Sequence, residues 1–573
     1  MENRWRGTSG PRDAKIVIVG ESWGAEEARR QLPFVGNTGN ELDKMLAEAG
    51  ISRQSCFITN VVPAQPPGNR MWEFMRETKE ARLAEMKAIR GLYPNQQVLN
   101  GVDNLCYQLS EVKPEVIIGF GNYALWALTE SDFRIKDEHS RKVPVGIGAW
   151  RGSQLHCSED MGGFRLMPTY HPATIFHSWP WRYDIVHDLK SRLPKALNGQ
   201  WDPPAYNFHI RPSFSDVLAW LEKLIVEAED RKDPQWLGVD LETAHGYISC
   251  IGIAWSDLDA LCIPLTHHHN TEAYFSPDEE ALIALALRDL MQHPNIRIAG
   301  SNFLYDAQYF ALQLGFIPKC DADTQILQHC LWLNKQKSLS YVSSLYNHYH
   351  RYWKEEGKSR HPTFDDEQHW SYNCTDCVTT RQAARHLRRL ADKLEQQEQA
   401  ELQMSQFALC LDIMLRGIKM DVAAKVGMSV DLSILMGERS EWLEGIIPES
   451  CYPRNTKASP WYTSPIQTME ILYDMLGAKE SSGKKKKGPR SSDDTALDHI
   501  GASDPLLKPI TDAIRELRSL GKFKTNFCEM LLDPDDRARC FFDPTGTNTL
   551  RWASRQSAFD TGANLQTLPK GNE

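Results

Sequence analysis

Asp240-Leu241-Glu242 comes at the end of the apolar run Trp236–Leu241, and further apolar runs follow at 247–255 and 260–265 after short turns. Apolar runs joined by short turns predict an antiparallel meander. Side chains two positions apart on a strand point to the same face, so Asp240 and Glu242 should stand side by side. Paired carboxylates supply the oxygen ligands that a hard divalent cation prefers. This stretch therefore predicts a sheet that carries a metal site.

Two later motifs add carboxylates in a fixed order. Asn302-Phe303-Leu304-Tyr305-Asp306 follows a predicted strand, 296–299. Tyr372-Asn373-Cys374-Thr375-Asp376 is expected to open a helix, where a spacing of four puts Tyr372 and Asp376 on one face. A D-x-E pair alone is more often a solvated strand end. The three motifs together indicate one constellation.

These residues resemble the exonuclease motifs D-x-E, N-x-x-x-[FY]-D and Y-x-x-x-D of the DnaQ-like fold, as embedded in family A DNA polymerases. The resemblance implies a 3′→5′ exonuclease that uses two Mg²⁺ or Mn²⁺ ions per site. Asp240, Glu242 and Asp376 would hold the first ion, and Asp240 with Asp306 the second. Tyr372 would orient the attacking water. Two ions about 4 Å apart can activate a water and stabilise both attacking and leaving oxygens.

The resemblance to family A polymerases continues past residue 400. It rests on Leu415–Asp421, Ser464–Gln467, Leu517–Phe527, Thr547–Ser554 and Asn564–Pro569. The first three blocks resemble a mostly helical thumb, and the last two resemble the start of a palm, although Leu550 and Trp552 depart from the usual Gly and Leu. The resemblance implies that Arg551 and Gln566 contact DNA.

A basic cluster interrupts the predicted thumb. It consists of Lys484, Lys485, Lys486, Lys487 and Arg490. The cluster is expected to lie near DNA phosphates, which Lys and Arg neutralise. The alternative is a solvated loop.

The family's palm aspartates and fingers lysine have no counterpart up to Glu573. Phosphoryl transfer to a dNTP needs metal-held phosphates. The sequence therefore predicts no DNA synthesis by this chain alone. We expect a primer–template as one partner and a second polypeptide with the palm and fingers as another.

The first 200 residues alternate predicted strands and helices. The apolar runs 15–20 and 115–119 are typical of buried parallel strands, and 38–50 has the spacing of an amphipathic helix. Five motifs follow in order: Gly20–Glu27, Pro33–Gly36, Thr59–Val62, Pro66–Arg70 and Pro168–Pro172. They resemble the uracil-DNA glycosylase superfamily, above all its iron–sulfur branch.

That resemblance implies a base pocket. Phe34 would stack on a flipped base, Asn60 would pair with a uracil edge, and His171 would hydrogen-bond the base oxygen that gains charge. Glu21 or Glu27 would position a water. Activity itself stays open, because Trp23 replaces a proline of the family motif; a DNA-binding module that keeps the fold is the alternative.

The cysteines bear on the predicted cofactors. None of the thirteen precedes residue 56, and Ala64 stands where the branch has a cluster ligand. We therefore expect no iron–sulfur cluster. Scattered, unpaired cysteines fit a reducing compartment.

Composition bounds the remaining properties. The chain has 573 residues, 41% of them hydrophobic, and a formal net charge of −10. Its longest apolar stretch, 116–128, is too short to span a bilayer. We expect a cytoplasmic protein, in the host cytoplasm if phage-encoded, with no membrane partner.

The expected fold is a multidomain α/β protein. It comprises a uracil-DNA glycosylase-like α/β/α domain (1–200), an RNase H-like (DnaQ) exonuclease domain (205–395), a polymerase thumb (396–540) and the start of a palm (541–573). The leading hypothesis is the proofreading and DNA-binding part of a split family A replicase. The alternatives are a base-excision repair enzyme with an end-trimming exonuclease and a non-catalytic primer–template platform.

Overall fold

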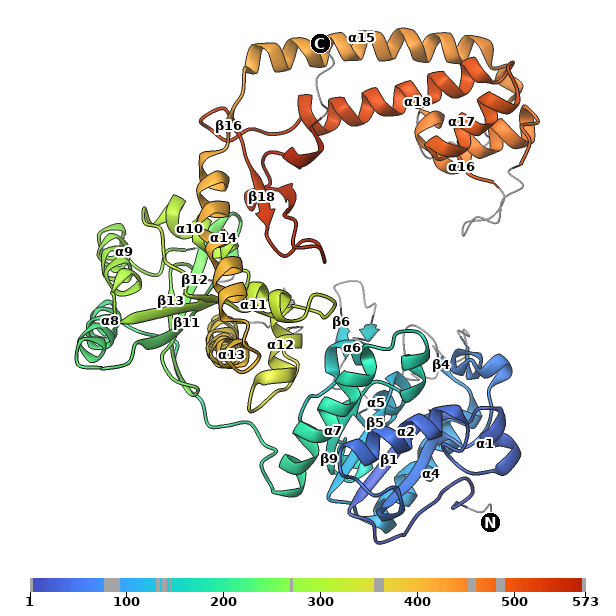
Figure 1. The fold of residues 1–573 in the computed structure, drawn as a ribbon, viewed down its shortest axis with the longest axis vertical. Helices are drawn as coiled ribbons and strands as arrows, with labels where there is room; N and C mark the ends of the chain where they lie inside the picture. The colour runs from blue at the N-terminus through green and yellow to red at the C-terminus, as the bar shows by residue number, and fades with distance from the viewer. Residues whose placement is uncertain are drawn as a thin grey trace. The chain divides into compact units, whose positions relative to one another are not determined.

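The computed structural model divides the chain into two compact units, Met1–Phe407 and Ala408–Glu573. It describes residues 4–76, 93–129, 134–136, 142–144, 146–267, 272–354, 365–451, 460–480 and 490–568. The basic run Lys484–Lys487 and the last residue of the palm motif, Pro569, lie outside the described residues. Both units mix helices with sheets, so the predicted multidomain α/β class is confirmed (Figure 1).

The N-terminal part of the first unit is built on a five-stranded sheet of order β2-β1-β5-β9-β8. Its strands are β1 (Ile16–Ser22), β2 (Cys56–Val62), β5 (Val116–Phe120), β8 (Leu155–His156) and β9 (Arg165–Thr169). β1 pairs in parallel with β2 and β5, as the two apolar runs predict, and only β8 runs antiparallel to its neighbour. Burial of the central strands explains why they are continuously apolar.

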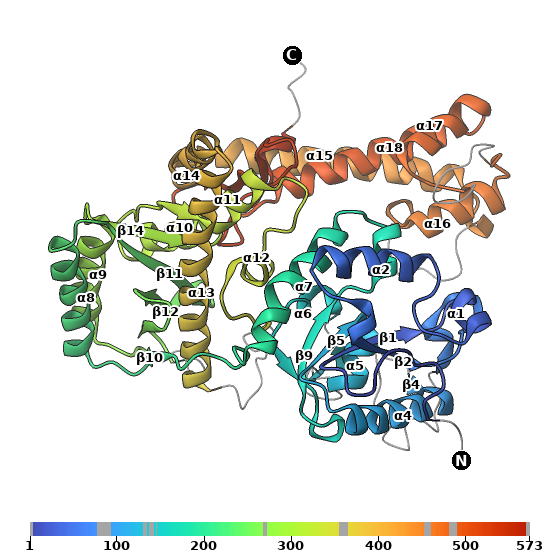
Figure 2. The ribbon, with the colours of Figure 1, turned by 60° about the horizontal axis from the view of Figure 1, so that its bottom comes forward.

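Helices cover this sheet (Figure 2). The main ones are α2 (Asn37–Glu48), α4 (Gln96–Val112), α5 (Asn122–Thr129) and α7 (Trp181–Leu197). The predicted helix 38–50 corresponds to α2, whose buried face carries Leu42, Met45 and Leu46. The chain leaves α2 through Gly50 at φ 75°, a backbone conformation that favours glycine.

A six-stranded sheet of order β10-β13-β12-β11-β14-β15 follows in the same unit. Its strands are β10 (Asn207–His209), β11 (Gln235–Ala244), β12 (Tyr247–Ala254), β13 (Asp259–Pro264), β14 (Ile296–Gly300) and β15 (Ala322–Asp323). β11, β12 and β13 form the predicted antiparallel meander, and β14 adds to β11 in parallel. The helices α8 (Phe214–Glu229) and α9 (Pro277–Gln292) pack against each other beside this sheet (Figure 1).

Helix α13 (Asp366–Lys393) crosses β11 and β12 at very short range. A Cβ on Gly238 would lie 2.2 Å from the carbonyl oxygen of Cys377, and one on Gly252 would lie 2.4 Å from Asn373 Oδ1. At Gly238 the obstacle is the helix backbone, so this position must be glycine for the helix to sit this close; at Gly252 a Cβ would displace the side chains of Asn373 and Cys377. The expectation that the Tyr372 motif opens a helix is wrong, because α13 begins at Asp366.

The second unit is mainly helical. Its long helices α15 (Val422–Ile446) and α18 (Lys508–Phe523) lie side by side, and α17 (Asp494–Ser503) packs on α18 (Figure 1). A core around Leu443, Ile471 and Leu517 joins them. The strands β18 (Cys540–Asp543) and β19 (Ala553–Gln556) pair antiparallel. Among the described helices of the whole chain, none is long and apolar enough to cross a membrane.

Candidate metal centre and base pocket

Three carboxylates from two elements meet on the second sheet. Asp240 and Glu242 lie on β11, opposite Gly252 and Cys250 of β12. Asp376 lies on α13, and one ligand atom from each of the three carboxylates falls within 4.8 Å of the others. An all-oxygen donor set of this kind fits Mg²⁺ or Mn²⁺. The alternation along β11 and the close approach of α13 together create this candidate metal centre.

Asp306, the fourth predicted ligand, is tied to the same strand. It lies on α10 (Leu304–Gln313), and its Oδ1 accepts a hydrogen bond from Leu241 N–H at 3.0 Å. It is not part of the three-carboxylate group. The turn before α10 depends on Asn302, which adopts φ 58°, a conformation that asparagine tolerates better than most residues.

Asn373 contacts a predicted metal ligand, and the sequence did not predict this role. Its Nδ2 donates to Asp240 Oδ2 at 3.0 Å and to the Asp240 carbonyl oxygen at 3.2 Å. Asn373 is fully buried. Its position directly after Tyr372 is the only sequence feature that could have drawn attention to it. By fixing the Asp240 carboxylate, it orients a predicted metal ligand.

The centre brings several acidic side chains together in a buried environment. Burial and then repulsion from Asp376 raise the pKa of Glu242 to about 8. Burial, followed by repulsion from Asp376 and Glu242, raises the pKa of Asp240 well above its ordinary value. Carboxyl groups that resist ionisation together in this way favour a bound cation.

Two residues outside the motifs contact Asp376. Trp353 Nε1 donates to Asp376 Oδ1 at 2.6 Å, and Lys354 Nζ forms an ion pair with Oδ2. Lys354 also donates to the hydroxyl of Tyr372 at 3.1 Å. Both residues lie in an irregular loop, where no helical or strand periodicity marks them in the sequence.

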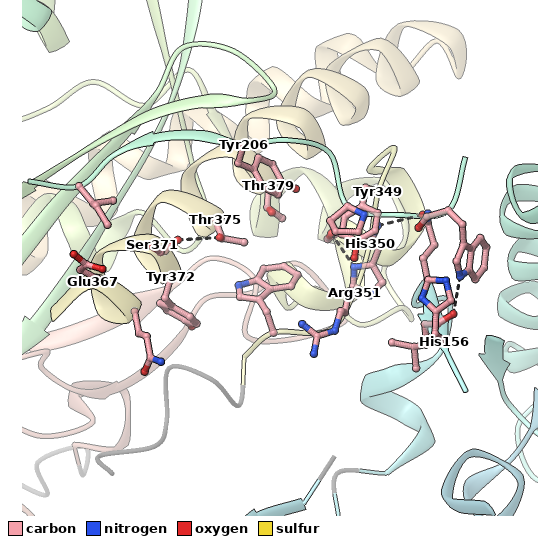
Figure 3. Close-up of a pocket in the computed structure, with 18 of the residues that line it drawn as sticks. His156, Tyr206, Tyr349, His350, Arg351, Glu367, Ser371, Tyr372, Thr375 and Thr379 are labelled. Atoms are coloured by element: carbon pink, nitrogen blue, oxygen red, sulfur yellow. Dashed lines mark hydrogen bonds between the residues drawn. The ribbon is translucent and has the colours of Figure 1, made fainter. Parts of the chain in front are cut away.

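A cavity of about 1010 Å³ is lined by Tyr372 and Trp353, beside the centre, and not by its carboxylates. Tyr372, Thr375 and Thr379 of α13 line one side, and His156 of the N-terminal part lies at the other end (Figure 3). Arg351 and Tyr349 lie between them. Tyr372, the predicted water-orienting residue, is therefore accessible from a cavity to which both parts of the first unit contribute.

Three of the five predicted base-pocket residues gather at the carboxyl ends of parallel strands. Asn60 lies on β2, and His171 follows β9. The rings of Phe34 and His171 stack at 5.8 Å, and a Cβ on Gly20 would lie within 2.6 Å of both Phe34 and Asn60. Asn60 Oδ1 is buried with no hydrogen-bond partner among the described residues. Ligands in parallel α/β sheets bind at this edge.

The state of His171 follows from its contacts. Its Nδ1 accepts a hydrogen bond from Ala173 N–H at 3.3 Å, which leaves the proton on Nε2. Burial lowers the pKa of His171 to about 4, although Glu27 opposes this shift. His171 is therefore neutral at physiological pH and has a donor at Nε2.

The two predicted glutamates contact backbone groups. Glu21 Oε1 accepts from Tyr123 N–H at 3.1 Å, near the start of α5. Glu27 Oε1 accepts from Val35 at 3.1 Å and Gly36 at 2.9 Å. Glu27 thereby fixes the loop that presents Phe34, whose φ of 49° is strained for an aromatic residue.

The residues predicted to contact DNA lie in the second unit. Arg490 is paired with Asp474 and Glu480, each at 2.6 Å, so its charge is already compensated. Arg551 is exposed, and Gln566 Nε2 donates to the carbonyl oxygen of Trp552 at 3.1 Å. Leu550, which replaces a glycine of the family motif, adopts φ 59°.

The sheet with its base-pocket residues and the sheet with its carboxylates define a multidomain α/β protein with two candidate sites. Residues 8–190 match the model of the "Uracil DNA glycosylase superfamily". The type-4 uracil-DNA glycosylase of Thermotoga maritima is 30% identical over 166 residues, 29% of this chain and 68% of that protein. That of Sulfurisphaera tokodaii is 47% identical over 188 residues, 32% of this chain and 71% of that protein. Through this segment the chain belongs to the uracil-DNA glycosylase superfamily.

A second relationship extends over nearly the whole chain. The DNA polymerase of Bacillus phage SP01 is 19% identical over 626 aligned positions, 96% of this chain and 62% of that protein. DNA polymerase I of Synechocystis sp. is 23% identical over 381 positions, 63% of this chain and 36% of that protein. The structure of the POL domain of Pol1 from M. smegmatis with DNA primer-template and dNTP superposes with a TM-score of 0.48 at 16% identity, covering 64% of this chain and 56% of that one. The homology is to family A DNA polymerases, and the chain spans less than two thirds of their length.

Proposed function

We propose that the carboxylate centre is a divalent-metal-dependent 3′→5′ exonuclease that proofreads for a family A DNA polymerase. The observation that carries the proposal is the convergence of Asp240, Glu242 and Asp376 within 4.8 Å. Homology to family A polymerases supports DNA as the substrate. The direction of degradation follows from the resemblance of the three motifs.

The residues divide the work. Asp240, Glu242 and Asp376 would hold one Mg²⁺ or Mn²⁺, and Asp240 with Asp306 a second. When bound, the ions supply Lewis acidity at the scissile phosphate. Tyr372 orients a water through its hydroxyl, while Asn373 keeps the Asp240 carboxylate in place.

A primer labelled at its 5′ end, with a mispaired 3′ end and Mg²⁺, tests the proposal. We expect stepwise shortening by the wild-type protein and none by the Asp240→Ala/Glu242→Ala double variant, because each ion loses ligands. Asp233→Ala removes an exposed carboxylate just before β11 and is the matched control. Full activity in the double variant would contradict the assignment of this centre as the exonuclease site.

The polymerase-related half is proposed to bind the primer–template. These 573 residues contain no counterpart of the palm aspartates, so we expect them to shorten a primer but not to extend it. A second polypeptide with the palm and fingers stays a prediction. Primer extension by the purified chain alone would contradict it.

A second candidate activity is uracil release by the N-terminal domain. The buried, unpartnered Asn60 Oδ1 and the Phe34–His171 stack favour a base-binding pocket. Asn60 would bind the uracil edge and neutral His171 would donate from Nε2 to the departing base. Alkali-labile breaks in uracil-containing DNA, lost in His171→Ala, are the expected result. Without breaks, retained DNA binding would favour a binding module.

A further inference from the structure

Both carboxylate oxygens of Asp376 are held by one short loop. Residues 350–354, here named the bridging segment, contribute Trp353 to Oδ1 and Lys354 to Oδ2. Trp353 is buried, and the Lys354 side chain is 26% exposed. A residue that belongs to none of the three motifs thus occupies each oxygen of a predicted metal ligand.

The same segment is attached to the glycosylase-like domain. The carbonyl oxygen of His350 accepts from Gln154 N–H at 2.7 Å, and Tyr352 N–H donates to Ser153 Oγ at 3.2 Å. The Tyr352 ring packs edge-on against Trp150, with centroids 5.1 Å apart. Within five residues, the chain therefore passes from contacts with the glycosylase-like domain to contacts with the metal centre.

The attachment also includes two buried arginines of the glycosylase-like domain. Arg151 and Asp188 form an ion pair with side chains 1% and 0% exposed. Arg151 Nη1 also donates to Ser344 Oγ, and Arg192 Nη2 donates to the Ser344 carbonyl oxygen, both at 2.8 Å. Ser344 lies on α12 (Leu339–Tyr346), just before the bridging segment. Separating the two parts would leave the buried guanidinium groups of Arg151 and Arg192 without these acceptors, which is unfavourable.

We propose that the glycosylase-like domain positions the exonuclease centre through the bridging segment. Trp353 and Lys354 act as positioning residues on the two carboxylate oxygens of Asp376, with opposite effects on metal binding. Trp353 places a neutral N–H on Oδ1, which orients the carboxylate and leaves the other oxygen for a cation. Lys354 places its ammonium group beside Oδ2, where it occupies the position of the metal ion until an ion displaces it. The inference rests on the proposed metal-dependent exonuclease and gives the N-terminal domain a role in it.

We expect substitutions of these two residues to change Mn²⁺ affinity in opposite directions. Trp353→Phe keeps the ring and removes the donor, and partners of metal ligands typically change metal affinity by about 10–100-fold. We expect Mn²⁺ to bind about tenfold more weakly to Trp353→Phe. Lys354→Met removes the competing charge, so Mn²⁺ should bind several-fold more tightly.

The measurement is Mn²⁺ binding to the full chain, by electron paramagnetic resonance of the free ion, alongside the metal dependence of primer shortening. Tyr352→Ala and Ser153→Ala test the domain connection without touching the centre, and both should weaken Mn²⁺ binding as Trp353→Phe does. Trp72→Ala changes an exposed aromatic of the same domain, 52% exposed, and should leave binding unchanged. Thermal unfolding of each variant separates these effects from loss of fold.

The outcomes are distinct. Unaltered Mn²⁺ affinity in Trp353→Phe, or weaker affinity in Lys354→Met, overturns the roles assigned to these residues. Normal affinity in both Tyr352→Ala and Ser153→Ala overturns the connection between the domains. A wild-type protein that neither binds Mn²⁺ nor shortens primers refutes the proposed exonuclease itself.

Discussion

Asn373 donates a hydrogen bond to Asp240 across 3.0 Å, from the same helix that supplies Asp376. The contact links two predicted metal ligands through one helical turn. Asn373→Ala should therefore weaken metal binding and primer shortening by about 10–100-fold at limiting Mg²⁺. Gln382→Ala, on the same helix, is the control. Unchanged metal dependence in Asn373→Ala would show that Asp240 needs no support.

Removing one charge from the ion-free centre should stabilise the first unit. The raised pKa of Asp240 means that folding disfavours its charged form at neutral pH, and one unit of pKa is worth about 1.4 kcal/mol. With chelator present, Asp240→Asn should unfold at a higher temperature than the wild type. Added Mn²⁺ should raise the melting temperature of the wild type much more than that of the variant. Equal shifts in both would place the ion elsewhere.

His171 should titrate far below an ordinary histidine. Burial lowers its pKa to about 4, so the folded domain resists protonation that the unfolded chain accepts at pH 6.5. This histidine's contribution to stability is thus present above pH 6.5 and is lost as the pH falls toward 4. Histidine-selective NMR, assigned with His171→Asn, measures the value. An ordinary pKa would remove the argument for a neutral donor.

The purified protein should contain no iron–sulfur cluster. The described cysteines of the glycosylase-like domain are Cys56, Cys106 and Cys157. Burial raises the pKa of Cys56 to about 11 and also raises that of Cys157, so both are poor sources of the thiolate that iron needs. Iron and sulfide analysis of anaerobically purified protein is the check. Stoichiometric amounts of both would contradict the expectation.

Leu550→Gly should stabilise the second unit. Leu550 adopts φ 59°, a left-handed conformation that costs a residue with a side chain about 1–2 kcal/mol. The greater freedom of glycine in the unfolded chain offsets part of this gain, leaving about 1 kcal/mol or less. Chemical unfolding followed by a probe in this unit gives the value. A clear loss of stability would mean that the leucine side chain makes contacts that outweigh the strain.

Local periodicity predicted the parts of the fold that depend on local rules. The meander of β11, β12 and β13 and the pairing of Asp240 with Glu242 follow from strand alternation. The helix that carries Tyr372 was expected to start at the motif, but it starts at Asp366, because Asp365 caps it by accepting a hydrogen bond from Gln368 N–H. Because the residues at that start are charged, apolar periodicity did not reveal it.

Contacts between distant segments were beyond the reach of sequence patterns. Trp353 and Lys354 reach Asp376 from an irregular loop that hydrogen bonds tie to the N-terminal part. Arg490 was expected near DNA phosphates, yet two carboxylates from separate positions neutralise it. Such pairings depend on tertiary distance, which neither spacing nor composition encodes.

The glycines that admit α13 onto the sheet provide a way to judge other chains. Gly238 and Gly252 belong to none of the exonuclease motifs, yet a single methyl group at either would lie less than 2.5 Å from the helix. A relative can therefore keep all four carboxylates and still have lost the geometry, if either glycine has changed. In a set of aligned relatives, these two positions should therefore be compared together with the acidic residues when active nucleases are separated from inactive descendants.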